Sequence, residues 1–185
     1  MRTTSEPDYP TGDPAYRSVA TLDEIPRGLT CSALAATAIA PKAEIIPCGS
    51  FEEAAALVKA KKAGAAFVPA AYPKLGALLM DEALAAVAVF LFPIPALVLA
   101  SVPGALPGKV ARLFHHPATT PLLPKAKVQP GELVPMSSNT AAAARAVETS
   151  GVCITNEACA AHFGLHIHQV LRSRRLMPFV VFVAA

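Results

Sequence analysis

Short apolar runs alternate along the chain with Ala-rich stretches that follow a Ser, Thr or Asn. The runs are typical of strands, and the stretches after a capping residue are typical of helices. Strands are expected at residues 19–22, 43–47, 65–69, 87–100, 110–114, 133–136, 152–155, 166–171 and 177–183. Helices are expected at residues 30–39, 50–62, 73–79, 117–123, 140–148 and 157–163, with Gly131 in a loop. This alternation predicts an α/β fold with a largely parallel sheet.

The two segments at residues 136–145 and 152–158 share one design. In each, an apolar strand ends in small polar residues and an Ala-containing helix follows, with Asn139-Thr140 and Asn156 at the turns. The first turn of a helix leaves backbone N–H groups unpaired and carries partial positive charge, which favours anions. We therefore expect these helix starts to hold a small negatively charged ligand.

The composition narrows the class of protein. The 185 residues are 54% hydrophobic and 16% charged, with a formal net charge of +3. This is enough apolar chain for one compact domain or two small lobes, and it is unlike a disordered chain. The basic clusters at residues 59–62 and 172–175 are short. They do not form the clustered basic face that nucleic-acid binding requires, so no nucleic acid is expected.

The long apolar run at residues 83–102 is close to the length of a membrane-spanning helix. Pro93 and Pro95 interrupt it, so it is interpreted as two buried strands and no membrane association is expected. No basic segment precedes an apolar core at the N-terminus, and the cysteines fit neither a paired framework nor CxxC spacing. A reduced, cytoplasmic protein is the expectation, with residues 1–17 as a flexible arm rich in Pro, Thr and Ser.

Several short motifs occur in order along the chain. They are GLTCS at residues 28–32, PCGSF at 47–51, VPAAY at 68–72, HHP at 115–117, NTAAA at 139–143 and TNE at 155–157. Together they resemble the catalytic domain of prephenate dehydratase and, more closely, the bacilysin-type non-aromatising prephenate decarboxylases. The VPAAY motif carries this preference, because the dehydratases have VPIENS at that place and the decarboxylases have V-P-x-A-Y. The likeness spans about residues 19–182.

The resemblance implies a two-lobe fold like that of type II periplasmic binding proteins. Residues 18–185 would form a single catalytic domain. Lobe one would cover about residues 18–88 and 166–185, and lobe two about 89–165. The resemblance implies that the protein uses no cofactor and that its binding partner is a small-molecule carboxylate substrate. A homodimer is left open.

The segment Met177-Pro178-Phe179 stands where dehydratases have Thr-Arg-Phe. The family Thr assists loss of the ring hydroxyl, whereas the decarboxylase relatives carry Met. The resemblance therefore implies loss of CO2 without aromatisation, in specialised-metabolite (antibiotic) biosynthesis. Ala33 in place of a family Glu, and an altered turn at residues 25–29, leave the substrate open.

The resemblance and the helix starts together suggest a set of substrate-binding residues. They are Thr30, Cys31, Ser32, Ala71, Tyr72, His115, His116, Asn139, Thr140 and Met177. The hydroxyl and amide residues at helix starts could equally be plain caps. Cys31 could have a lowered thiol pKa there, but a covalent role is not favoured because no base is adjacent.

Other polar residues give weaker signals. His115 and His116 point to opposite faces of a strand, so no metal site is expected. Arg174 and Arg175 could clamp a carboxylate, although solvated loop charges are the favoured interpretation. No catalytic residue is identified.

Three functions follow from these observations. The first is a prephenate-decarboxylase-like carbon–carbon lyase. The second is a dehydratase or isomerase of the same fold that acts on a related small acid. The third is a small-anion-binding module without catalysis, because this fold also binds ligands without chemistry.

Overall fold

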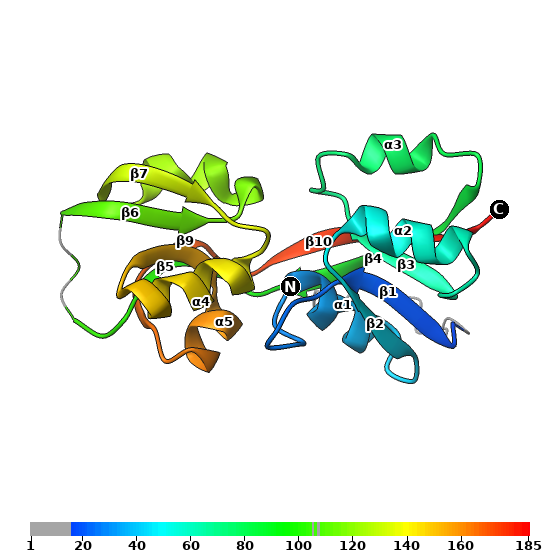
Figure 1. Ribbon diagram of the computed structural model, residues 1–185, viewed down its shortest axis with the longest axis horizontal. Helices are drawn as coiled ribbons and strands as arrows, with labels where there is room; N and C mark the ends of the chain where they lie inside the picture. The colour runs from blue at the N-terminus through cyan, green and yellow to red at the C-terminus, as the bar shows by residue number, and fades with distance from the viewer. Residues whose placement is uncertain (1–15, 105, 107) are drawn as a thin grey trace, which may run out of the picture.

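The chain folds into two α/β lobes, each built on a five-stranded mixed sheet (Figure 1). The structure is a computed structural model that describes residues 16–104, 106 and 108–185. The strand order is β2-β1-β3-β10-β4 in the first sheet and β7-β6-β8-β5-β9 in the second. The chain passes from the first lobe to the second between β4 and β5, and it returns between β9 and β10. The predicted two-lobe α/β architecture is confirmed.

The first lobe holds eight elements. They are β1 (Ser18–Leu22), α1 (Cys31–Ile39), β2 (Glu44–Cys48), α2 (Phe51–Lys59), β3 (Ala65–Pro69), α3 (Leu75–Leu79), β4 (Leu84–Ile94) and β10 (Arg175–Ala184). The second lobe also holds eight. They are β5 (Leu97–Ser101), β6 (Lys109–His115), the 3-10 helix η1 (Pro117–Lys125), β7 (Gln129–Pro135), α4 (Asn139–Thr149), β8 (Val152–Asn156), α5 (Glu157–His162) and β9 (His166–Arg172).

Helix starts follow the local capping signals in the sequence. In α2, the Ser50 hydroxyl accepts a hydrogen bond from the Glu53 N–H at 3.0 Å, and the Glu53 carboxylate accepts one from the Gly49 N–H at 2.8 Å. This is a variant of the capping box, in which the carboxylate usually reaches the N-cap residue itself. The helix therefore begins where the sequence predicts.

Small side chains let the helices lie close to the sheets. Ala33, Ala35 and Ala36 of α1 are almost completely buried, as are Ala142 and Ala143 of α4. Phenylalanines fill the remaining space, with Phe67, Phe179 and Phe182 in the first lobe and Phe114 in the second. Each lobe thus has its own core, and the helix starts are held rigidly against the strands that precede them.

The prediction of a largely parallel sheet is wrong. β1 runs parallel to β2 and β3, and β6 runs parallel to β7 and β8, but β10 and β5 are antiparallel to both of their neighbours. The parallel strands are joined by helices within one lobe, which produces parallel neighbours. β10 and β5 instead arrive from the other lobe, so no helical crossover sets their direction.

The predicted lobe boundaries are wrong at two places. β4 continues in the first sheet to Ile94, and β9 pairs with β5 in the second sheet, so residues 89–94 and 166–172 change lobe. Pro93 does not end β4, because β4 lies at an edge of its sheet, where proline is tolerated. Gly131 is also not in a loop, since it lies within β7, where an added Cβ would be only 3.1 Å from the Ala111 carbonyl oxygen.

The apolar run at residues 83–102 forms β4 and β5 rather than a helix. β5 is buried as predicted, but β4 is buried along one face only. Among the described residues, no helix has the length and apolar character needed to cross a membrane. Of the N-terminal arm predicted at residues 1–17, residues 1–15 lie outside the described part of the chain.

Candidate functional site

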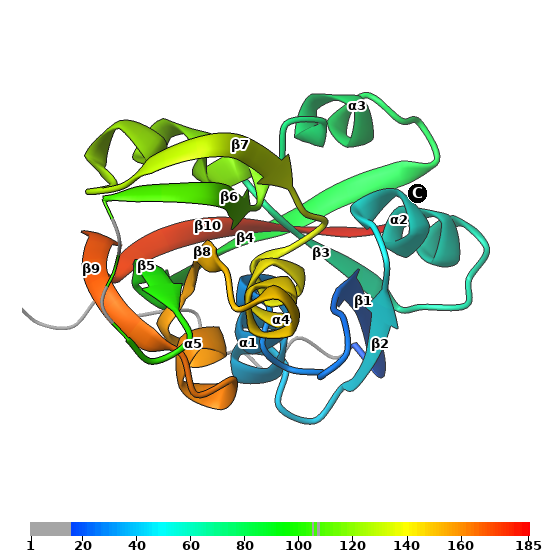
Figure 2. The ribbon, with the colours of Figure 1, turned by 60° about the vertical axis from the view of Figure 1, so that its left-hand side comes forward.

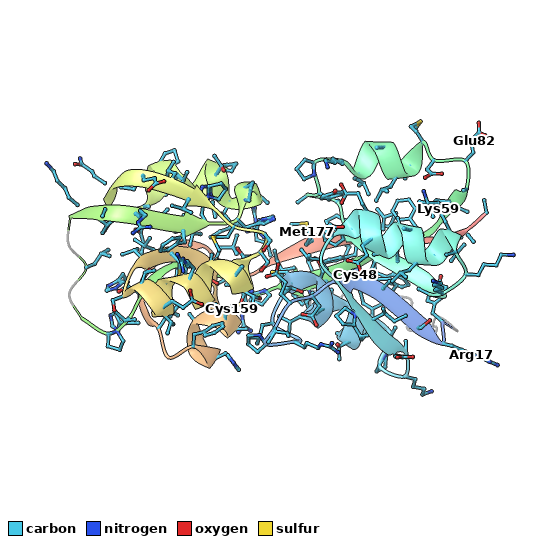
Figure 3. The ribbon with its side chains drawn as sticks, viewed as in Figure 1. Arg17, Cys48, Lys59, Glu82, Cys159 and Met177 are labelled. Atoms are coloured by element: carbon cyan, nitrogen blue, oxygen red, sulfur yellow. The ribbon has the colours of Figure 1, made fainter. Side chains whose placement is uncertain are left out.

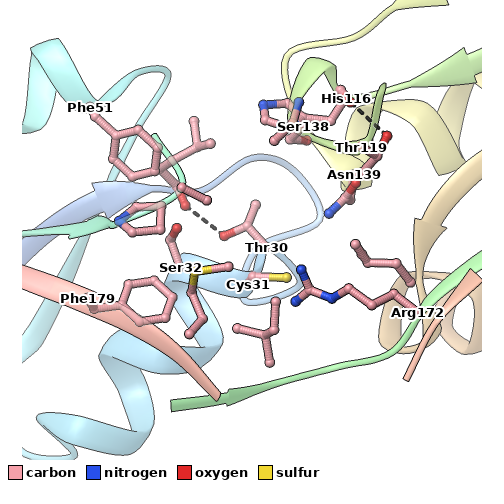
Figure 4. Close-up of a pocket in the computed structure, with 17 residues that line it drawn as sticks. Thr30, Cys31, Ser32, Phe51, His116, Thr119, Ser138, Asn139, Arg172 and Phe179 are labelled. Carbon is pink, nitrogen blue, oxygen red and sulfur yellow. Dashed lines mark hydrogen bonds between the residues drawn. The ribbon is translucent and has the colours of Figure 1, made fainter. Parts of the chain in front are cut away.

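A pocket lies between the two lobes, where α1 and α4 both begin (Figure 4). It encloses about 700 Å³ of atom-free space, part of which opens to solvent. The first lobe lines it with Leu22, Thr30, Cys31, Ser32, Phe51, Pro69, Ala71, Ile94, Met177 and Phe179. The second lobe lines it with Leu97, His116, Ala118, Thr119, Ser138, Asn139 and Arg172. The first lobe therefore supplies most of the apolar wall, and the second supplies most of the polar groups.

The N-cap hydroxyls at the pocket are already bonded within the protein. Thr30 Oγ1 accepts from the Ala33 N–H at 3.0 Å and donates to the Leu22 carbonyl at 2.7 Å. Ser138 Oγ accepts from the Ala141 N–H at 2.9 Å and donates to the Glu24 carboxylate. Both hydroxyls serve as caps, so a ligand at these helices would meet the backbone N–H groups of the first turn instead.

Arg172 supplies a buried, unsatisfied positive group at the pocket. Its Nε and Nη2 atoms are buried without a hydrogen-bond partner, and so is Oδ1 of Asn139. Figure 4 shows the guanidinium reaching from the end of β9 toward Cys31 at the start of α1. Burying such groups unpaired costs about 1–3 kcal/mol for each polar group and more for a charge. A ligand that carries a carboxylate would remove this cost through the planar fork of the guanidinium.

Arg172 was not expected at the site, because in the sequence it is only part of a short basic cluster. Arg174 and Arg175, the two arginines considered as a carboxylate clamp, have other roles. Arg174 Nε donates to the Glu157 carboxylate at 2.5 Å, and Arg175 is exposed at the start of β10. Arg172 could have been recognised only from the lobe boundary, because it ends the last strand before the chain returns to the first lobe.

Seven of the ten residues predicted to bind substrate line this pocket. They are Thr30, Cys31, Ser32, Ala71, His116, Asn139 and Met177. They come from helix starts, loops and β10, far apart in the chain, and the closing of one lobe on the other brings them together. Their role in substrate binding stays a prediction.

The structure places Tyr72, His115 and Thr140 away from the pocket lining. The Tyr72 ring packs on Phe51 with the centroids 4.8 Å apart, and its hydroxyl bonds the Glu52 carboxylate. His115 is 5% exposed, and its Nδ1 lies 3.2 Å from the His116 carbonyl. Thr140 is fully buried, with Oγ1 3.5 Å from the Cys159 sulfur. Each neighbours a pocket residue in sequence, but its own side chain is held by other groups of the protein.

His116 is a neutral donor at the pocket. Its Nδ1 accepts a hydrogen bond from the Ala118 N–H at 3.3 Å, so the neutral ring carries its proton on Nε2. Burial, reinforced by the neighbouring His115, lowers the pKa of His116 below its ordinary value. At neutral pH the ring therefore stays uncharged and is a poor source of protons.

No Asp or Glu among the described residues lines the pocket. The Glu24 carboxylate accepts a hydrogen bond from the Ser138 hydroxyl, which is part of the lining. No described cluster of three His, Cys, Asp or Glu side chains could hold a metal ion. The pocket is therefore suited to binding and desolvating a carboxylate, and poorly suited to strong acid catalysis.

Burial raises the pKa of the Cys31 thiol to about 12, the opposite of the lowering considered from the sequence. With its thiol pKa raised in this way, Cys31 should be alkylated by iodoacetamide at pH 8 much more slowly than an exposed thiol. The rate should rise tenfold for each pH unit, because the thiolate is the reactive species. Peptide mapping by mass spectrometry measures it, with urea-unfolded protein as the fast control. Rapid labelling of the folded protein at pH 7 would contradict the assignment.

The loop at residues 23–30, which precedes α1 in the first lobe, makes hydrogen bonds to the second lobe. Asn156 Nδ2 donates to the Leu29 carbonyl at 3.0 Å, and Asn156 Oδ1 caps α5 by accepting from the Cys159 N–H at 2.8 Å. On the same loop, Glu24 receives the hydrogen bond from Ser138. The TNE motif thus links the second lobe to the loop that precedes α1.

Replacing Asn156 with Ala should destabilise the protein by about 2 kcal/mol. The substitution removes a helix cap, worth about 1 kcal/mol, and a hydrogen bond worth about 1 kcal/mol to the Leu29 carbonyl, which keeps only the Cys159 thiol at 3.5 Å as a donor. Urea unfolding measures the change. Asn156→Ser is the matched control, because Ser can cap α5 but is too short to reach Leu29, and it should lose roughly half as much. Equal losses in the two variants would mean that the Leu29 contact contributes nothing.

Comparisons with known proteins give structural similarity only. No protein-family model matches the chain, and no curated protein matches it in sequence. The prephenate dehydratase of Arthrobacter aurescens, solved in complex with L-Phe, is 22% identical, with a TM-score of 0.65 over 91% of this chain and 60% of that one. GqqA, described as a novel type of quorum quenching acylase, is 19% identical, with a TM-score of 0.63 over 90% of this chain and 64% of that one.

A third similar structure is a VFT2 domain. The BvgS VFT2 domain of Bordetella pertussis is 14% identical, with a TM-score of 0.56 over 90% of this chain and 79% of that one. The chain spans less than two thirds of the length of the first two proteins. These similarities establish the architecture: the chain has the two-lobe fold of type II periplasmic-binding-protein-like domains, as found in prephenate dehydratases.

Proposed function

We propose that the chain binds a small-molecule carboxylate between its lobes and removes CO2 from it as a prephenate-decarboxylase-like lyase. The observation that carries this proposal is the unpartnered Arg172 guanidinium in a pocket that no described Asp or Glu lines. The resemblance of the sequence motifs supports the choice of a cyclohexadienyl keto acid. It also supports a cytoplasmic role in specialised-metabolite biosynthesis.

The pocket would contact the ligand through a polar part and an apolar part. The Arg172 fork and the first-turn N–H groups of α1 and α4 would hold one carboxylate. The apolar side chains of Leu22, Phe51 and Met177 would cover the ring. A second carboxylate on the ring would lie near this apolar wall, where loss of hydration favours its conversion to neutral CO2.

The type of reaction depends on whether a pocket residue can give a proton to the ring hydroxyl. In decarboxylation, the bond from the ring to the carboxylate breaks, its electron pair enters the ring diene, and one proton from solvent water adds to a ring carbon. The hydroxyl remains. Aromatisation by dehydration would instead need a proton on the leaving hydroxyl. Met177 has no proton to give and Pro178 has no backbone N–H, while His116 is neutral and Cys31 is a very weak acid.

Incubation with prephenate should therefore yield a product that has lost CO2 and kept the ring hydroxyl. Mass spectrometry identifies the product, and ultraviolet absorbance follows phenylpyruvate. We expect no phenylpyruvate above the spontaneous rate. The Arg172→Met variant is the control, and it should show only the spontaneous reaction.

Two other outcomes would change the assignment. Robust phenylpyruvate formation by the unmodified protein would contradict the decarboxylase proposal and favour a dehydratase, with His116 as the first candidate for the acid. Tight binding of unaltered prephenate would favour a binding module without catalysis. The scarcity of acid–base groups in the pocket makes that module the second candidate.

A further inference from the structure

Strand β4 is a long edge strand that carries no charge. It runs from Leu84 to Ile94 with the sequence LAAVAVFLFPI, and among the described residues it pairs with β10 alone. Figure 2 shows it along the outer side of the first lobe, below α3. One face of the strand is open to solvent, with Val87 51%, Val89 59% and Leu91 40% exposed.

Proteins usually protect an edge strand of this kind from pairing with a strand of another chain. Its outer N–H and C=O groups can pair with another strand, and proteins normally prevent this with charged side chains or very short strands. The other sheet edges follow that rule, because β2 carries Glu44, β7 carries Glu132 and β9 carries Arg172. β4 departs from it with an exposed apolar face, and only Pro93 near its end and a bulge at Val87, between Ala86 and Ala88, limit pairing.

We propose that a second copy of this chain covers the edge, with the two β4 strands paired antiparallel about a two-fold axis at Val89. In this register Val89 faces its own counterpart, and Leu91 of one copy faces Val87 of the other. The exposed apolar side chains of both copies then lie on one face, as the alternation of a strand requires. The two sheets join into one continuous sheet, and the contact is the same on both copies, as in most homodimers.

Two unpaired charges at opposite ends of the strand complement this arrangement. Glu82 precedes β4 and projects from the end of the first lobe (Figure 3), whereas Arg175 pairs in register with Ile94 at the other end. Both are exposed, and neither makes an ion pair with any described residue of its own chain. The two-fold axis brings Glu82 of one copy to the end that holds Arg175 of the other. Opposite charges therefore approach each other at both ends of the contact, with each Arg175 one strand behind it on β10, and this favours a second copy over an unrelated partner.

Sedimentation velocity of the full chain tests the proposal. We expect a dimer, and we expect Val89→Lys to be monomeric, because two lysines would face each other across the axis. The control is Val147→Lys, which alters a similarly exposed valine on α4 and should stay dimeric. A monomeric unmodified protein would overturn the proposal, and so would a dimer that Val89→Lys leaves intact.

A charge-swap series tests the register independently of folding. Glu82→Arg and Arg175→Glu should each weaken dimerisation at least tenfold, because like charges then meet at both ends. The double variant should restore it, since the pairs re-form with exchanged signs. Failure of the double variant to recover, while both single variants remain folded by circular dichroism, would rule out the antiparallel β4 contact.

Discussion

Replacing Arg172 with Met should abolish the rise in melting temperature that prephenate causes, and should leave the free protein at least as stable. Removing one partner of a desolvated charge pair costs about 2–5 kcal/mol of binding, which is roughly a 30-fold to several-thousandfold loss of affinity. In the free protein the buried Nε and Nη2 atoms are unpaired. Exchanging such a group for an apolar side chain of similar length is neutral or stabilising.

Thermal melting with and without ligand measures both effects in one experiment. Arg174→Met is the matched control, because its guanidinium pairs with Glu157 and does not line the pocket. It should keep the ligand-induced shift. Arg172→Lys keeps the charge but loses the planar fork, so it should retain only part of the shift. An undiminished shift in Arg172→Met would show that the carboxylate binds elsewhere.

Replacing Phe67 with Ala should destabilise the protein by about 3–5 kcal/mol, the range for a fully buried aromatic side chain. Phe67 is completely buried in β3, and its ring lies 6.4 Å from that of Tyr16 and 6.3 Å from that of Phe90. The loss is a large part of the 5–15 kcal/mol that holds a typical domain folded.

Urea unfolding monitored by circular dichroism measures this change. Leu79→Ala provides the comparison, since Leu79 lies on α3 with 45% of its surface exposed and should lose much less. A loss below about 1 kcal/mol for Phe67→Ala would mean that the core of the first lobe closes around the cavity far better than such cores usually do.

Local features of the fold could be predicted from the sequence. β3 spans Ala65–Pro69 as expected, α2 begins after Ser50, and the helix starts at Thr30 and Asn139 reach one pocket. These features depend on neighbouring residues. A cap acts within a single helical turn, and a strand of alternating or continuous apolar residues is visible over a few positions.

Other features depend on residues that are distant in the chain. The direction of β10 and the lobe to which β9 belongs follow from pairing with strands on the far side of a crossing between lobes. Tyr72 was expected to face the ligand, but Phe51 and Glu52 hold it elsewhere. Arg172 reaches the pocket only because β9 ends where the lobes meet, and nothing near it in sequence marks that place. Helix starts are thus set by contacts within a turn, whereas the charge at the site and the exposed edge of β4 are set by which strands pair across the whole chain.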